Sequence, residues 1–411
     1  MKCTGHFPYS CTGDFPYNTG RRLAVRSITP QTGGSPDPGD VLGRDDVILR
    51  LVDAARRGNN HLLSDPRRMG KTSLLIRLCN EPGPEVTAIK IDLEGCASVD
   101  EVVVRILGDL RQLAPLKDRA KSLILQSLDG GSAEVSVGPL TLSKTAKVAG
   151  SLATLESCVT AIDEELDEGQ LVVVALDEVT IAADSIARRE PEECHRLLQT
   201  LRHLRGDANP SVRWILSGSI GFHHVLRRAA ATEGLVNDLT PVELGPLAPI
   251  HAGQLATALF AGIGREANDD VIGHVVALTD GIPFMLHNAV HRLAGSTASV
   301  AVDEAAEAFE SYLADRGQSG AWTHLVSRID TYYENASLAT AVLDARAIRQ
   351  VPMSFDELCA LCPGVEPDDM RQLIDHLVDD HYLDDRTLTW RYDVLRDTWM
   401  LRRRLNAEAE S

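Results

Sequence analysis

Two short segments of the chain carry residues that can bind phosphate and activate water. In the first, HLLSDPRRMGKTSLLIRL at 61–78, an apolar strand is followed by a tight loop and by an amphipathic helix that begins at Lys71. Backbone N–H groups of such a loop and helix start bind phosphate oxygens, and Gly70 lets the backbone come close because it has no Cβ. Lys71 would neutralise the β- and γ-phosphates of a nucleotide, and the Thr72 hydroxyl would bind Mg²⁺. The segment therefore predicts a Walker A loop whose nucleotide-binding residues are Asp65, Pro66, Arg67, Arg68, Met69, Gly70, Lys71, Thr72 and Ser73.

This loop departs from the usual Walker A pattern at one position. The pattern G-x-x-x-x-G-K-[ST] has glycine where Asp65 stands in DPRRMGKT. Aspartate tolerates unusual backbone angles, but a carboxylate that pointed into the phosphate cradle would repel the nucleotide. We therefore expect the Asp65 side chain to point away from the phosphates. Arg67 and Arg68 either contact phosphates or a neighbour, or are solvated loop charges.

The second segment delivers two carboxylates to the end of a buried strand. GQLVVVALDEV at 169–179 is an aliphatic run that ends in Asp177 and Glu178, as a central strand of a parallel sheet does at its carboxyl end. Asp177 would hold Mg²⁺ through a water molecule, and Glu178 would orient and deprotonate the attacking water. Together with the preceding loop, this Walker B pattern predicts ATP hydrolysis and not binding alone.

A third segment, RWILSGSIGFHHVL at 213–226, is expected to form the neighbouring strand. Its end would lie beside the γ-phosphate, so Ser217 is a candidate γ-phosphate sensor, although Ser-Gly-Ser also suits an ordinary turn. Arg202, Arg205 and Arg213 are either surface arginines or candidates for an arginine finger that acts on a neighbouring subunit.

Composition places the chain among globular proteins. Its 411 residues suit roughly two to four domains, and 44% of them are hydrophobic. The formal charge of −18 disfavours general binding to nucleic acids. No run approaches the length of about 18 apolar residues that a membrane span needs, and no signal peptide is evident, so we expect a cytoplasmic protein with no membrane contact. Eight scattered cysteines form no disulfide framework, and the pair Cys359 and Cys362 lacks a second ligand pair for zinc.

The elements that must position these segments follow from the alternation of short apolar runs with amphipathic stretches. Between 41 and 239 this alternation predicts an α/β fold, a P-loop NTPase core with a parallel sheet, and its strands are expected at 61–64, 88–92, 171–176 and 213–217. The less regular stretch at 112–150 includes AEVSVGPLTLS, which suggests a hairpin or a flap.

The regions on either side of this core are expected to be different in kind. Residues 1–40 contain a repeated octamer and a Pro/Gly-rich stretch, and we expect a flexible N-terminal arm. An α-helical lid is expected at 240–335. Three helices and a strand pair predict a C-terminal winged-helix domain at 336–400, followed by a C-terminal tail at 401–411.

With these motifs in hand, the chain resembles the STAND class of AAA-like P-loop ATPases, in particular small bacterial and archaeal ATP-binding proteins with PRRxGKTSLL loops. The likeness covers roughly 41–400, and includes the family's GRE motif in VLGRDDVI and the GxP motif of the lid in DGIPF. The resemblance implies that ATP or ADP binds with Mg²⁺, that Pro283 lies against the adenine, and that Gly43 and Arg44 lie beside the nucleotide. It departs from the family in Asp65 and in lacking a recognisable repeat array or effector domain.

Three functions remain open at this stage. The leading hypothesis is a molecular switch whose nucleotide state controls self-assembly into a homo-oligomer or contact with a partner protein. The second is a DNA-acting ATPase of the origin-recognition type, which also joins such a core to a winged helix. Against it, residues 336–411 hold nine Lys and Arg and fifteen Asp and Glu, a net charge of −6, so DNA binding is not expected. The third is an inactive pseudo-ATPase scaffold, which Asp65 alone suggests.

Overall fold

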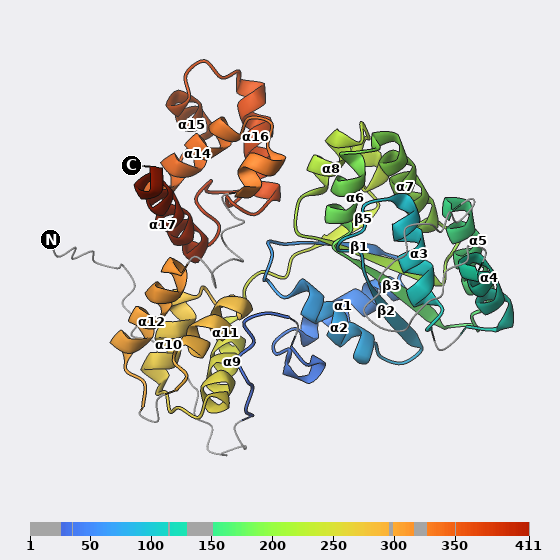
Figure 1. Cartoon of the computed structure of the whole chain (residues 1–411), viewed down its shortest axis with the longest axis horizontal. Helices are drawn as coiled ribbons and strands as arrows, with labels where there is room; N and C mark the ends of the chain where they lie inside the picture. Colours follow the sequence, from blue (N-terminus) through green and yellow to red (C-terminus); the bar gives the residue numbers. More distant parts are fainter. Residues whose placement is uncertain are drawn as a thin grey trace.

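The structure is a computed structural model that describes residues 26–34, 36–113, 116–129, 151–295, 299–315, 327–349 and 351–410. An α/β core is followed by two helical regions (Figure 1), and the second of these also contacts the core, where His381 meets Ser64.

A five-stranded parallel sheet forms the centre of the core. Its strands are β1 (Asn60–Ser64), β2 (Val86–Asp92), β3 (Leu171–Asp177), β4 (Val212–Gly218) and β5 (Leu239–Val242). Their order in space is β2-β3-β4-β1-β5. Strand β4 therefore lies between β1, which leads into the phosphate loop, and β3, which ends in the two acids. The four strands expected from sequence are confirmed, whereas β5 was not foreseen.

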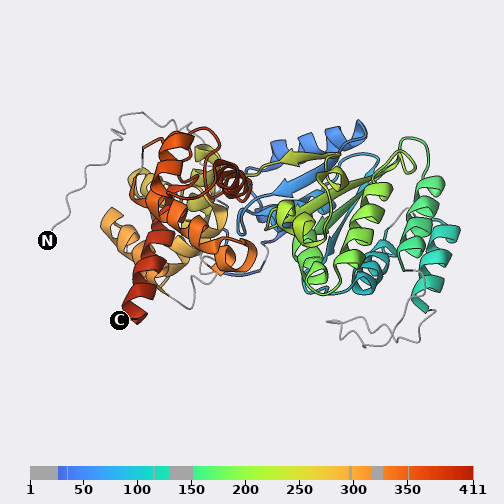
Figure 2. The ribbon, with the colours of Figure 1, turned by 90° about the horizontal axis from the view of Figure 1, so that it is seen from above.

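Helices cover both faces of this sheet because its interior strand β3 is apolar on both sides. Val172, Val174 and Leu176 of β3 face one hydrophobic cluster, and Val173 and Ala175 face another. In Figure 2, the blue helices lie on one face and the green and teal helices on the other. The helices of the core are α1 (Asp45–Arg56), α2 (Lys71–Asn80), α3 (Val99–Leu110), α4 (Asp118–Asp129), α5 (Ser151–Glu165), α6 (Val179–Ala187), α7 (Pro191–Leu204) and α8 (Phe222–Arg228), with short 3-10 turns η1 (Pro38–Asp40) and η2 (Glu233–Leu235).

The first helical region follows β5. It comprises α9 (Pro249–Gly262), α10 (Asp269–Leu278), α11 (Pro283–Arg292) and α12 (Val302–Ala314). The segment 26–34 packs against it, because Ile28 is 1% exposed and its N–H donates to the carbonyl oxygen of Ala258 at 3.0 Å. This part of the expected flexible arm is thus packed on the lid, contrary to the prediction for 1–40, and residues 1–25 lie outside the described residues.

The second helical region contains α14 (Ala336–Ile348), α15 (Phe355–Leu361), α16 (Pro367–Asp379) and α17 (Asp393–Glu410). The first three match the helices expected for the winged helix. The expected strand pair is reduced to one antiparallel bridge between Leu383 and Trp390. The residues expected as a tail, 401–411, instead continue α17 as far as Glu410. Both helical regions share one hydrophobic cluster, so they pack as a single unit.

One expected element lies largely outside the described residues, and the expectation about membrane spans can be compared with the described helices. The alternating segment AEVSVGPLTLS at 133–143 lies outside the described residues, whereas the preceding part of 112–150 contains α4. Among the described residues, no helix combines the length and the apolar character that crossing a bilayer would require.

Candidate functional site

A cavity of about 380 Å³ lies at the carboxyl ends of the strands, between the core and the lid. Ligands commonly bind at this edge of an open parallel sheet. Four parts of the chain line it: the N-terminal segment with Gln31, Gly34 and Pro36, the phosphate loop with the start of α2, the acids at the ends of β2 and β3, and the start of α11. Its lining residues are Gln31, Gly34, Pro36, Arg67, Arg68, Gly70, Lys71, Thr72, Ser73, Asp92, Glu94, Asp177, Glu178, Pro283, Phe284 and His287.

The phosphate loop has the backbone that a Walker A loop needs. Gly70 caps the N-terminus of α2 with φ +95°, a left-handed conformation that glycine adopts without strain. A Cβ at this position would meet no atom within 4 Å, so the reason for glycine here is the backbone angle. The N-terminus of α2 therefore faces the cavity with its first N–H groups free of intrahelical partners, which favours an anion.

Lys71 is buried at the centre of this loop. Its Nζ donates to the carbonyl oxygens of Asp65 and, at 3.0 Å, of Pro66. Burial lowers the pKa of Lys71, while the carboxylates of Glu178, Asp65 and Asp177 act in the opposite direction. To bind a phosphate, the ammonium group would have to exchange these carbonyl contacts for phosphate oxygens.

Asp65 points away from the cavity, as its charge predicts. Its carboxylate is buried and accepts hydrogen bonds from the backbone N–H groups of Leu244 at 2.8 Å and Gly245 at 3.3 Å. Arg44 lies beside it and donates to the carbonyl oxygens of Leu244 at 2.8 Å and Gly245 at 2.7 Å. The residue that replaces the first Walker A glycine thus fastens the phosphate loop to the connection between β5 and the lid.

This contact makes a prediction about stability. Asp65→Ala would leave two buried N–H groups without an acceptor, which costs about 1–3 kcal/mol. We expect the melting temperature to fall by a few degrees relative to wild type, measured by differential scanning fluorimetry. The exposed Asp207→Ala serves as the matched control and should melt like the wild type. Equal melting temperatures for both variants would contradict the fastening role.

The two acids that end β3 are each fixed by a serine of the neighbouring segment. Ser217 Oγ donates to Asp177 Oδ1 at 2.8 Å, and Ser219 Oγ donates to Glu178 Oε2 at 2.8 Å. Asp177 is 1% exposed and lies 3.7 Å from Lys90 Nζ. Glu178 has φ 55°, a left-handed angle that is unusual for a residue other than glycine and is often found in functional sites. The strand end and the two serines thus hold both carboxylates at the cavity.

Several predicted residues do not line the cavity. Gly43, Arg44, Asp65, Pro66, Met69 and Ser217 are absent from its lining. Ser217 is fully buried against Asp177, so in this structure it orients the acid and does not face the cavity. Gly43 supports the lid, because a Cβ on it would lie 2.5 Å from the His251 side chain of α9. A role for these residues beside the nucleotide stays a prediction.

The cavity is also lined by residues that the sequence analysis did not identify. Asp92 ends β2 and pairs in register with Asp177, so both carboxylates reach the same sheet edge. Glu94 lies two residues further on and forms an ion pair with Arg67 at 3.1 Å. The strand pattern itself pointed to Asp92, since the expected strand 88–92 ended on it.

The lid contributes an apolar part of the cavity lining, Pro283 and Phe284. The guanidinium of Arg68 lies 4.5 Å from the centre of the Phe284 ring. The backbone N–H of Gln31 donates to His287 Nδ1 at 3.0 Å, so the neutral imidazole carries its proton on Nε2. Burial lowers the pKa of His287 to about 4, which keeps the ring neutral at physiological pH. Pro283, the predicted adenine contact, is in this part of the lining.

The three arginines that are candidates for an arginine finger differ in their surroundings. Arg205 is buried and forms two hydrogen bonds to the Asp238 carboxylate, at 2.8 and 2.9 Å. Arg213 donates to the carbonyl oxygen of Asn209 at 3.1 Å. The Arg202 side chain is 39% exposed and lies 3.4 Å from Asp238. Arg205 would have to break a buried ion pair to reach a second subunit, which leaves Arg202 and Arg213 as the better candidates.

The donor set at the cavity suits Mg²⁺ and a nucleotide. Mg²⁺ prefers oxygen ligands, and the Thr72 hydroxyl and the Asp177 and Glu178 carboxylates supply them at one end of the cavity. A buried ammonium group and a helix N-terminus suit phosphates, and the wall of Pro283, Phe284 and His287 suits a flat base. The residues present therefore fit both groups.

Comparisons with known proteins found similar solved structures but no matching family model or curated protein. Among solved structures, the Walker-type ATPase PABY2304 of Pyrococcus abyssi is 19% identical with a TM-score of 0.60, over 92% of this chain and 99% of that one. The ORC2 protein of Aeropyrum pernix, solved as ADPNP-ADP complexes, is 12% identical with a TM-score of 0.46, over 90% of this chain and 95% of that one. The RuvB Holliday junction branch migration motor of Thermotoga maritima is 14% identical with a TM-score of 0.35, over 85% and 91%.

The chain thus has the α/β fold of P-loop ATPases, a parallel sheet core followed by helical regions. The similarity to the Pyrococcus abyssi protein extends over almost the whole of both chains, so the helical regions belong to the shared architecture.

Proposed function

We propose that this protein binds ATP with Mg²⁺ in the cavity between core and lid, hydrolyses it, and acts as a molecular switch of the STAND type. One observation carries the proposal. A single cavity collects Lys71 and Thr72 of the phosphate loop, the acids Asp177 and Glu178, and an apolar wall of the lid. A pseudo-ATPase scaffold would have no need to keep this complete set together.

Each residue has a role that follows from its position. The N–H groups at the start of α2 and the Lys71 ammonium bind the phosphates. Glu178, held by Ser219, accepts a proton from the attacking water, and Asp177 and Thr72 hold the metal. Bound Mg²⁺ would neutralise the charge that develops on the phosphates.

The contacts between the winged helix and the core explain how nucleotide could control shape. His381 donates from Nε2 to the carbonyl oxygen of Ser64, the residue directly before the phosphate loop. Arg391 forms an ion pair with Glu243 at 2.5 Å, next to the connection that Asp65 fastens. When Lys71 turns from the carbonyl oxygens of Asp65 and Pro66 to a phosphate, the backbone beside Ser64, which accepts the hydrogen bond from His381, would be free to shift. We infer that the ATP-bound state releases the winged helix, and that the released surfaces contact a partner protein or a second copy.

This switch predicts a change of shape between nucleotide states. Glu178→Gln bound to ATP should have a larger radius of gyration than the same protein bound to ADP, measured by small-angle X-ray scattering. Light scattering on the same samples should show a larger mass if self-assembly is the output. Lys71→Ala, which should bind both nucleotides more weakly than the wild type and so show a smaller change, is the control. Identical radii and masses in both states would refute the switch and leave the ATPase proposal standing.

A DNA-reading role fits the surface less well. On α16, which would be the recognition helix, Asp368, Asp369 and Asp375 are exposed, and DNA phosphates would repel them. Arginines near the chain end are engaged elsewhere: Arg402 donates to the carbonyl oxygen of Leu313 at 3.3 Å, and Arg403 pairs with Asp344 at 2.8 Å. We therefore favour a protein partner over DNA.

A further inference from the structure

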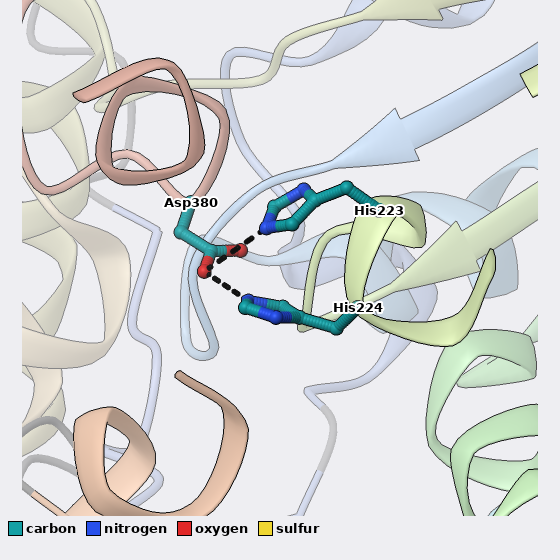
Figure 3. A group of neighbouring side chains, drawn as sticks. All are labelled: His223, His224 and Asp380. Carbon is teal, nitrogen blue, oxygen red and sulfur yellow. Dashed lines mark hydrogen bonds and ion pairs between the residues drawn. The ribbon is translucent and has the colours of Figure 1, made fainter. Parts of the chain in front are cut away.

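A cluster of two histidines and one aspartate lies at the contact between the core and the winged helix. His223 and His224 come from α8, which follows β4, and Asp380 caps the C-terminus of α16. Figure 3 shows both imidazole rings directed at the Asp380 carboxylate. His224 Nε2 lies 2.7 Å from Asp380 Oδ2, and His223 Nε2 lies 3.8 Å from the same oxygen. None of these residues lines the nucleotide cavity.

We propose that His223, His224 and Asp380 form a transition-metal site, zinc by the chemistry of its ligands, that ties the winged helix to the core. Two imidazole nitrogens and one carboxylate oxygen form a ligand set that Zn²⁺ uses, with a fourth position open to water. Mg²⁺ and Ca²⁺ prefer oxygen ligands only, so this set excludes them.

The spacing of the ligand atoms suits such an ion. Bonds of about 2.0–2.1 Å in tetrahedral geometry place neighbouring ligand atoms roughly 3.3 Å apart. The three candidate atoms all lie within 4.8 Å of one another, and the two measured spacings to Asp380 bracket the ideal value. Small side-chain rotations would therefore complete the site without moving either helix. His224 would pass its Nε2 proton to Nδ1 or to solvent when the metal–nitrogen bond forms.

Neighbouring residues orient the three proposed ligand side chains. The His223 Nε2 and His224 Nδ1 atoms are buried and have no hydrogen-bond partner among the described residues. Asp380 is oriented by Tyr333, whose hydroxyl donates to Oδ2 at 2.7 Å, and by the Gly221 N–H, which donates to Oδ1 at 2.9 Å. The His376 ring stacks on His223 with centroids 4.2 Å apart. Such second contacts fix the orientation of metal ligands.

The proposed site lies between the core and the winged helix, so a bound metal ion would link the two. Helix α8 follows the segment whose Ser217 and Ser219 hold the two cavity acids, and α16 belongs to the winged helix. A metal ion that joins α8 and α16 would hold the winged helix on the core. By mass action, it would stabilise the form of the protein in which the two are in contact.

The test uses the full chain, stripped with a chelator and then kept in excess Mg²⁺. Wild type should bind about one Zn²⁺ per chain in a titration against a chromogenic chelator, and Zn²⁺ should raise its melting temperature. His223→Ala should bind at least tenfold more weakly at this site and show no such rise. The exposed His203→Ala is the matched control and should behave like the wild type. Because His223 Nε2 makes no hydrogen bond among the described residues, the variant should fold, which its melting temperature without metal will show.

Cobalt provides a second readout. Co²⁺ bound by the three side chains should give the visible absorption of a tetrahedral site, which His223→Ala should lose. Zinc binding that is equally tight in wild type and His223→Ala would place the ion elsewhere in the chain and overturn the proposal. The absence of stoichiometric binding to wild type would overturn it as well. Neither outcome bears on ATP binding.

Discussion

Lys71→Ala should bind ATP about ten- to a hundredfold more weakly than the wild type. The substitution removes the one ammonium group buried at the phosphate end of the cavity, among the residues that the structure describes. A hydrogen bond to a charged group contributes about 1.5–3 kcal/mol, and each 1.4 kcal/mol is a factor of ten in affinity. The measurement is a titration with a fluorescent ATP analogue in the presence of Mg²⁺, repeated by calorimetry with unlabelled ATP.

The control for this variant is Lys117→Ala. Lys117 is exposed and pairs with Asp167 at 2.7 Å, far from the cavity lining, so its loss should leave ATP affinity unchanged. Melting temperatures of both variants will show whether the fold is intact. Equal affinity in wild type and Lys71→Ala would remove the assignment of this cavity to nucleotide.

The parts of the site that could be predicted from sequence are those set by neighbours in the chain. The phosphate loop is a strand, a turn and a helix start within one segment, so Gly70, Lys71 and Thr72 reach the cavity wherever that segment folds. Asp177 and Glu178 follow an aliphatic strand, whose burial fixes where its end must lie. The outward direction of Asp65 followed from charge alone, although the backbone groups that it binds did not.

The parts of the fold and of the site that could not be predicted from the sequence depend on contacts between segments far apart in the chain. Asp65 and Leu244 meet because β5 pairs with β1 in the sheet, and His381 reaches Ser64 because the second helical region packs against the core. No spacing in the sequence records such a contact. The same holds for Gln31, which reaches His287 only because its segment packs on the lid. The strand β5 was missed because it is only four residues long and contains a proline, which suits its place at the edge of the sheet.

Glu178→Gln should keep ATP affinity within a few-fold of the wild type and lose hydrolysis. A positioned general base contributes about 10²–10⁴-fold to the rate, so kcat should fall by that factor. Glutamine has the same shape, and its carbonyl oxygen can still accept the hydrogen bond that Ser219 donates to Glu178 at 2.8 Å. The geometry of the site is thus kept while the group that accepts a proton is removed.

The matched control is Glu94→Gln, a second carboxylate at the cavity whose side chain is 61% exposed and paired with Arg67. Phosphate release under saturating ATP and Mg²⁺ measures kcat for both, and a nucleotide titration measures affinity. Glu94→Gln should hydrolyse ATP at nearly the rate of the wild type. If Glu178→Gln hydrolyses ATP as fast as the wild type, another group activates the water, and Asp92, which shares the sheet edge with Asp177, becomes the next residue to change.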